Sequence, residues 1–200
     1  MEEISKWSNR FTWTAIIQGA IVTALTIILT TIVITTQAAQ SLISTIIGNP
    51  AVGFIEIAAL AGLGLYVIIG VIATGLSAQF YHHLEVRLGK KYGRGSKANS
   101  LAWAHLVLMN IGIAAASSIM IYAGYIGDIA VTSKEERLLF GLGSGWGWTI
   151  QQASEQILNP LIVPAGIMLL IAAIGAVCGG IGFILVYFRK DENLKTRREK

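Results

Sequence analysis

The sequence predicts an all-α, polytopic membrane protein with four transmembrane helices and both termini on the cytoplasmic side. Only 13% of the 200 residues are charged and 54% are hydrophobic, whereas soluble domains carry roughly 25% charged residues. Four apolar runs each reach the length of about 20 residues that is needed to cross the hydrocarbon core of a bilayer. The basic residues lie almost entirely in segments that four spans would place on one side. These observations together favour lipid as the solvent of the chain.

The whole chain, 1–200, is expected to form a single membrane domain. The four spans are predicted at about 12–36, 54–80, 101–125 and 157–188. The first run is apolar enough to continue as helix to residue 47. Pro50 lies in the short connection to the second span and cannot continue a helix, so the first two spans should be antiparallel neighbours.

The fourth span contains two prolines, Pro160 and Pro164, which we place in its first turns, where proline costs least. The loop 127–156 is expected to lie on the outer side. Thr132 or Ser133 precedes a glutamate by three residues, the spacing of a capping box that opens a short helix. Trp146 and Trp148 are predicted to dip into the outer interface, where indoles prefer to lie; the alternative is that they pack on a partner subunit.

Charge determines the predicted orientation. Positive residues stay on the cytoplasmic side of membranes. Thirteen of the fifteen basic residues fall in the N-terminal segment, the loop between the second and third spans, and the tail 189–200, which lie on one side of a four-span protein. The other side keeps only Lys134 and Arg137. We therefore place both termini in the cytoplasm and the protein in the cell membrane.

The same placement explains the high isoelectric point, about 9.3. Basic residues next to a membrane attract anionic lipid headgroups, by about 1 kcal/mol each near the surface. Anionic lipid headgroups at the cytoplasmic face are therefore expected partners, and nucleic acid is not.

Ionisable and amide side chains inside lipid are costly and are candidates for function. The sequence offers Glu56 near the start of the second span, and His105 and Asn110 in the third. For Glu56, an interfacial glutamate reaching headgroup water competes with a proton-relay or inter-subunit role. For His105, a hydrogen bond to a neighbour competes with cofactor ligation. His82 and His83 are adjacent and point about 100° apart on a helix, so we expect them to anchor the interface and not to chelate a metal.

The residue pattern indicates no catalytic centre in this chain alone. It lacks a Ser–His–Asp set and paired carboxylates, and its single Cys178 lies in an apolar run. A haem or copper centre inside a bundle normally needs imidazoles, and no span carries a histidine near its middle. We expect no metal and no cofactor on this chain alone.

Small residues in register are the clearest feature of the spans. Small faces let helices approach until dispersion and hydrogen bonds hold them together in lipid. The predicted helix-packing residues are Gly70, Gly112, Gly175, Gly179 and Gly182. The many threonines of the first span are expected to bond to carbonyls of their own helix and do not require a pore.

The segment 79–128 resembles the link between the last helices of the catalytic subunit of haem–copper oxidases. In that family a helix ends with an aromatic pair, a short basic loop follows, and the next helix opens with a histidine-containing segment and ends at a glycine turn. The matching residues here are Phe80 and Tyr81, the loop 88–90, the segment 105–112 and the turn 124–127. The directions of the spans match as well. The haem-ligating histidines of the family have no counterpart in the second span, and Asp128 follows the glycine turn where the family has an arginine pair.

The resemblance thus implies a scaffold that lacks the haem and copper ligands. It suggests a non-catalytic integral membrane subunit of a respiratory terminal oxidase or related electron-transfer complex, which acts as a helix-packing scaffold. Its partners would be other integral membrane subunits, and haem and copper would belong to them. The alternative is a stand-alone small oligomeric membrane transporter or channel. An independent catalytic role with haem at His105 is a third hypothesis.

Overall fold

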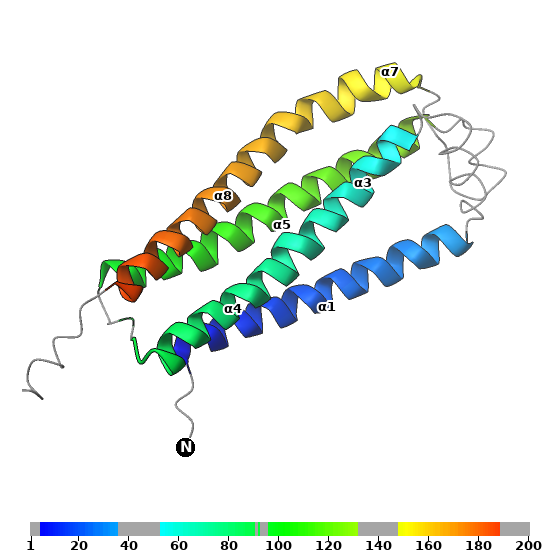
Figure 1. Cartoon of the computed structure of the whole chain (residues 1–200). Helices are drawn as coiled ribbons and strands as arrows, with labels where there is room; N and C mark the ends of the chain where they lie inside the picture. The colour runs from blue at the N-terminus through cyan, green and yellow to red at the C-terminus, as the bar shows by residue number, and fades with distance from the viewer. Residues whose placement is uncertain (1–4, 36–52, 91, 93–95, 132–147, 189–200) are drawn as a thin grey trace, which may run out of the picture.

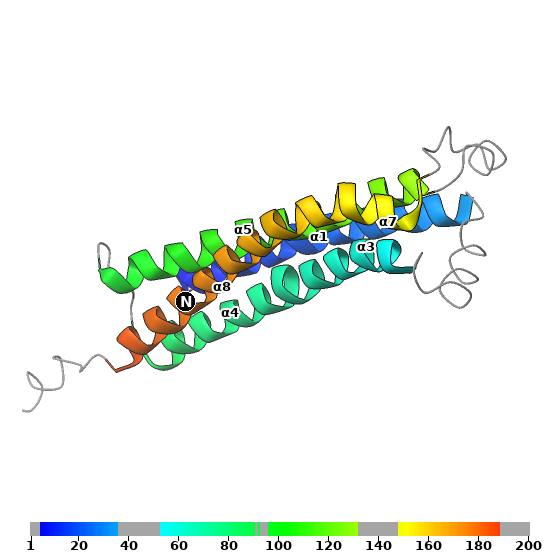
Figure 2. The same cartoon turned by 90° about the horizontal axis from the view of Figure 1, so that it is seen from above.

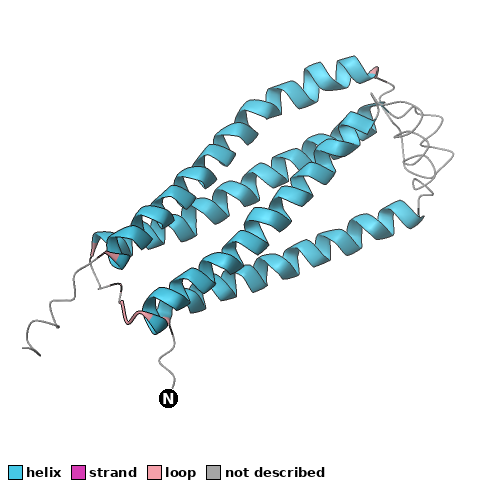
Figure 3. Ribbon diagram, in the orientation of Figure 1, coloured by secondary structure: helices cyan, strands magenta, loops and turns pink. Residues whose placement is uncertain are grey.

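The computed structural model describes residues 5–35, 53–90, 92, 96–131 and 148–188, and these parts are helical apart from short connections (Figure 3). No strand occurs among the described residues. The elements join into four long helices. They are α1 (Lys6–Thr35); α3 (Gly53–Leu65) with η1 (Tyr66–Ala73), α4 (Thr74–His82) and η2 (His83–Arg87); α5 (Lys97–Val131); and α7 (Ile150–Ala153) with η3 (Ser154–Leu158) and α8 (Asn159–Tyr187). The η segments are π-helical turns, which occur mostly inside α-helices and often at functional sites.

All four helices are long and apolar enough to cross a membrane, by length and composition. Their outward faces carry large apolar side chains, among them Ile27, Ile68 and Ile162, each more than half exposed. Such a surface suits lipid and would be unusual on a soluble monomer. The predicted all-α fold with four membrane-length helices is confirmed.

The helices pack in the order α8, α5, second helix and α1 (Figure 1). Seen from above, α5 and the second helix lie on opposite sides of α8 and α1 (Figure 2). The α5–α8 contact is the most extensive, and α1 packs on α4 and η1. One end of the bundle, where α1 and α5 begin and η2 and α8 end, carries Arg10, Arg87 and Lys97. We call it the basic end. α3 and α7 begin at the opposite end.

At the basic end, Ser5 fixes the start of α1. Its Oγ accepts a hydrogen bond from the backbone N–H of Ser8 at 3.0 Å and donates one to Glu85 Oε2 at 2.5 Å. The backbone N–H of Trp7 also donates to Glu85 Oε2, at 3.4 Å. A carboxylate is favourable at a helix N-terminus, where free N–H groups and the helix dipole attract negative charge. Glu85 thus attaches the start of the first helix to the end of the second.

The second helix is longer than the predicted span, which ended at residue 80. It continues through both adjacent histidines to Arg87 and stops at Gly89, whose φ of 63° lies in the left-handed region that favours glycine. Tyr92 then packs back against Trp7 and Leu84. Burial and the nearby Glu85 charge raise the pKa of the Tyr92 phenol, so this ring stays neutral.

The predicted boundaries at the opposite end also differ from the structure. α5 continues to Val131, so residues 127–131 are helical and do not begin the loop. The fourth helix begins at Ile150 and not near residue 157. Pro164 therefore lies inside the helix, and the π-helical turn η3 comes directly before Pro160 at the start of α8. A proline ring clashes with the carbonyl four residues back, and a wider π turn gives that carbonyl room.

Apolar packing explains the extra helical turns. Ala130, Ala153, Ile157 and Leu158 form a buried cluster, with Trp148 packed against it. The backbone N–H of Trp148 donates to Ala130 O at 2.8 Å. Trp148 is thus half-buried against the bundle. The helical extension to residue 47, the capping box at 132–136, Trp146 and the basic tail 189–200 lie outside the described residues.

Candidate functional site

Three of the predicted packing glycines form the seam between α5 and α8. A side-chain carbon added to Gly112 would lie 2.6 Å from the backbone nitrogen of Ala172 and 2.6 Å from the carbonyl oxygen of Met168. A carbon added to Gly175 would collide with the backbone of Met109, and one on Gly179 with the ring of His105. Gly182 is less tight, at 3.3 Å from Leu101 Cβ. These glycines therefore pack against helices of the same chain and are not free to contact another subunit.

Gly70 belongs to a different contact, between η1 and α1. A carbon added there would lie 2.7 Å from Gln18 Oε1 and 2.8 Å from Tyr66 Cδ2. The missing side chain gives room both to the tyrosine one turn earlier and to an amide from α1. Gly70 therefore makes a buried polar contact possible.

That contact is a triad of uncharged polar side chains from three helices, Gln18 of α1, Thr74 of α4 and Asn110 of α5. Asn110 Oδ1 accepts a hydrogen bond from Gln18 Nε2 at 2.5 Å and one from Thr74 Oγ1 at 3.0 Å. Asn110 Nδ2 donates to the carbonyl of Leu106 at 2.6 Å. All three side chains are buried. The triad joins three of the four helices in the interior of the bundle.

The triad leaves one acceptor unused. Gln18 Oε1 is buried and has no hydrogen-bond partner. The same is true of the hydroxyl of Ser117 on α5. A buried polar atom without a partner costs free energy, because it has lost water and gained nothing. Together with the buried hydroxyl of Tyr92, which also has no partner, these atoms are the places in the described interior where a bound water or another polar group would be most stabilised.

Sequence reasoning identified Asn110 and missed Gln18 and Thr74. Gln18 was the available signal, because it is the one amide in an otherwise apolar and threonine-rich run from residue 12 to 36. Thr74 carried no signal, since threonines in helices usually bond to their own carbonyls. That expectation is confirmed in α1, where Thr23 and Thr26 donate to carbonyls four residues back, at 2.8 and 2.9 Å.

His105 lies among aromatic rings near the basic end. Its Nδ1 is 3.3 Å from the hydroxyl of Tyr81, and its ring centroid is 4.9 Å from that of Phe11. Phe11 in turn stacks on Tyr81 at 4.9 Å. Gly179 closes the remaining side. The structure therefore gives His105 a hydrogen-bonding neighbour, which was one of the two expectations for this residue.

The remaining candidates lie apart from the triad. His82 and His83 are exposed near the end of the second helix. The backbone of Glu56 belongs to α3, but its side chain lies outside the described residues. Within the described parts, no three His, Cys, Asp or Glu side chains come together in a way that could hold a metal ion.

Comparisons of the chain with known proteins found no relative. No protein-family model matches the chain, and no curated protein or solved structure does so either.

Proposed function

We propose that the chain is a non-catalytic integral membrane subunit that acts as a helix-packing scaffold in a larger membrane complex. The observation that carries the proposal is a second small-residue face on α8, separate from the seam with α5. It consists of Gly166, Ala173, Ala176 and Gly180, all exposed. A side-chain carbon added to Gly166 or Gly180 would meet nothing within 4 Å.

The spacing of these residues places all four in one strip on a side of α8, which the exposed side chains of Leu170 and Val177 flank. Steps of seven, three and four residues return to the same side of a helix, and the strip runs for roughly 21 Å at 1.5 Å per residue. Lipid covers large apolar side chains as well as it covers glycine. A small-residue strip instead allows close approach of another backbone, the arrangement that drives helix association in membranes.

The membrane setting is part of the proposal. Both termini are placed in the cytoplasm of a multi-pass protein in the cell membrane, on the strength of the basic residues. The resemblance favours a respiratory terminal oxidase or related electron-transfer complex as the assembly. Haem and copper would then reside in partner subunits, and extraction in mild detergent should recover the chain together with haem-bearing partners.

Two neighbouring glycines on α8 test the proposal. Gly180→Leu adds bulk to the outward strip, whereas Gly179→Leu adds it against His105 inside the bundle. We expect Gly180→Leu to keep the thermal stability of the isolated chain and to lose most of the slow-migrating complex on native gels. Gly179→Leu should lower the thermal stability of the isolated chain itself.

Gly64→Leu on α3 is the matched control, because Gly64 also has nothing within 4 Å and lies outside the strip. It should leave the complex intact. A wild-type chain that migrates alone at 21.4 kDa under the gentlest extraction would show that the subunit proposal is wrong.

The buried triad favours a second candidate, a small oligomeric transporter or channel. Polar groups inside a bundle often mark a substrate or ion path, and Gln18 Oε1 is an acceptor without a partner. Under this alternative, the reconstituted chain alone should pass ions or small solutes, and Gln18→Leu should reduce the flux. The subunit proposal expects no flux from the chain alone.

A further inference from the structure

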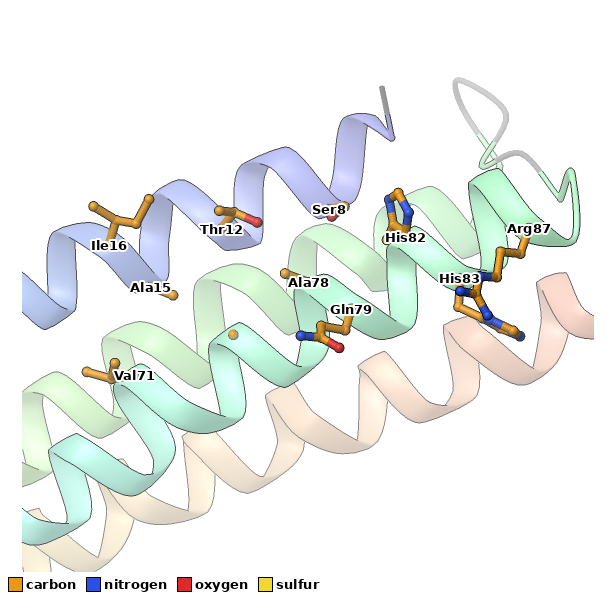
Figure 4. Close-up of a pocket in the computed structure, with 11 residues that line it drawn as sticks. Ser8, Thr12, Ala15, Ile16, Val71, Ala78, Gln79, His82, His83 and Arg87 are labelled. Carbon is orange, nitrogen blue, oxygen red and sulfur yellow. The ribbon is translucent and has the colours of Figure 1, made fainter. Parts of the chain in front are cut away.

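A groove of about 770 Å³ runs between α1 and the second helix on the outside of the bundle (Figure 4). Its size falls in the range of small-molecule sites, about 300–1,000 Å³. Both walls change from polar to apolar in the same direction, away from the basic end. On the α1 wall, Ser8 and Thr12 give way to Ala15 and Ile16.

The wall formed by the second helix shows the same change from polar to apolar residues more strongly. Arg87, His83, His82 and Gln79 form the polar part of this wall, nearest the basic end, and Ala78, Gly75 and Val71 form its apolar part. In Figure 4, the side chains of Arg87 and His83 lie close together, whereas the side chain of His82 points toward α1. A ligand that fits these walls has a polar head and an apolar tail.

The charge at the polar end of the groove determines which ligand headgroup would fit there. The residues that line the groove include one arginine, two histidines and no carboxylate. Glu85 lies two residues before Arg87, but its carboxylate accepts hydrogen bonds from Ser5 and Trp7 and does not line the groove. Guanidinium and imidazole N–H groups together suit a phosphate anion.

The length of the groove fits one leaflet of a membrane. From Val71 to Arg87 the second helix rises by at most about 24 Å, the value for an α-helix at 1.5 Å per residue, because its π-helical segments η1 and η2 rise less per residue. One leaflet with its headgroup region measures about 20–22 Å, half of the whole bilayer. A phospholipid standing in the leaflet at the basic end would therefore place its phosphate beside Arg87 when its acyl chain lies along Gly75.

From this geometry we infer that the groove is a binding site for an anionic phospholipid. The phosphate lies against Arg87 and His83, and an acyl chain lies in the apolar part beside Ala78 and Gly75. Basic pockets between membrane helices commonly bind such headgroups. The inference goes beyond a general attraction of the basic end for lipid, because it names one site with two distinguishable parts. It rests on the proposed membrane insertion of the helices, and it holds whether or not a protein partner exists.

The test measures thermal unfolding of the purified, delipidated full chain in a neutral detergent. The probes are dioleoyl phosphatidylglycerol, dioleoyl phosphatidylcholine with the same acyl chains, and inorganic phosphate. We expect the anionic lipid to raise the unfolding temperature by about 5 °C near saturation, and the other two probes to have a clearly smaller effect.

Two variants with matched controls then separate the parts of the site. Arg87→Gln should lose most of the shift caused by the anionic lipid, whereas Lys97→Gln should keep it, because Lys97 is an exposed basic residue at the same end outside the groove. Gly75→Leu should fill the groove and abolish the shift. Gly64→Leu should not, although both glycines belong to the second helix and have nothing within 4 Å.

Three results would overturn the site. Equal protection by both lipids would remove the role of the phosphate end. If inorganic phosphate raised the unfolding temperature as much as the anionic lipid does, the apolar part of the groove would have no role in binding. If the anionic lipid raised the unfolding temperature of both Arg87→Gln and Gly75→Leu as much as that of the wild type, the lipid would bind elsewhere. All readings are taken on the isolated chain, so failure of the partner proposal on native gels leaves this test unaffected.

Discussion

Threonines and amides in this bundle differ in where their hydrogen bonds go. Thr23 and Thr26 satisfy their hydroxyls within α1, so they tolerate an exposed position. Gln18 and Asn110 have longer amide side chains that reach across helices and bond to each other. Such a cross-helix bond is made only when the helices are assembled, and it therefore contributes to the assembled bundle.

Asn110→Ala tests this at the level of single residues. The change removes the common acceptor of the triad and leaves the Gln18 amide and the Thr74 hydroxyl buried with fewer partners. We expect the bundle to lose about 1–2 kcal/mol of stability, measured by unfolding in a series of denaturing detergent mixtures.

Thr23→Val is the control for Asn110→Ala, since Thr23 bonds only to its own helix in the described structure and should change stability by less than about 0.5 kcal/mol. A cycle with Gln18→Ala should give a coupling energy of about 0.6–1.7 kcal/mol between Gln18 and Asn110. If the effects of the two changes on stability simply add, the hydrogen bond between Gln18 and Asn110 does not contribute to the stability of the bundle.

At the scale of elements, the sequence predicted the helices well and their local geometry poorly. Length and apolar content were enough for four spans, because a backbone in lipid must satisfy its hydrogen bonds within each helix. The π-helical segment η1 was not predicted. Its residues, "YVIIGVIA", are apolar on nearly every side, so no polar pattern marks a change of period. In η1 and the following turn, Thr74 Oγ1 approaches the carbonyl five residues back, Ile69 O, at 3.4 Å and also reaches Asn110.

The same limit applies to the glycines. The sequence showed small residues on several faces of the third and fourth spans, but it could not tell which would be buried in the seam. The structure separates them. Gly112 touches the backbone of α8, while Gly166 faces outward.

Gly112→Ala and Gly166→Ala form a matched pair for the seam. A methyl group on Gly112 would lie 2.6 Å from backbone atoms of α8 and must push the helices apart. We expect Gly112→Ala to lower stability by about 1–3 kcal/mol, the usual cost of overpacking. Gly166→Ala should raise it by up to about 1 kcal/mol, because alanine is the better helix former and the site is open. Thermal unfolding of the two variants side by side gives the answer, and equal behaviour would argue against a tight seam.

At the scale of the whole molecule, the arrangement of the four helices adds a constraint that the linear sequence could only suggest. The ends that carry Arg10, Arg87 and Lys97 belong to three different helices, and the fold brings them to one end of the bundle. The opposite end holds Glu155, exposed on η3. Under the membrane proposal, this polarised bundle has one expected direction of insertion, with its basic end on the cytoplasmic side.

Cysteine labelling in whole cells tests that direction. The chain has a single cysteine, Cys178, within α8, so Cys178→Ser gives a background without thiols. Into it we would place Gln151→Cys at the opposite end and Lys97→Cys at the basic end, both at exposed positions. Because basic segments stay on the cytoplasmic side, a membrane-impermeant maleimide should label Gln151→Cys in intact cells and Lys97→Cys only after permeabilisation. The reverse pattern would invert the proposed orientation. Equal labelling of both positions in sealed cells would show that these helices do not span the membrane as a four-helix unit.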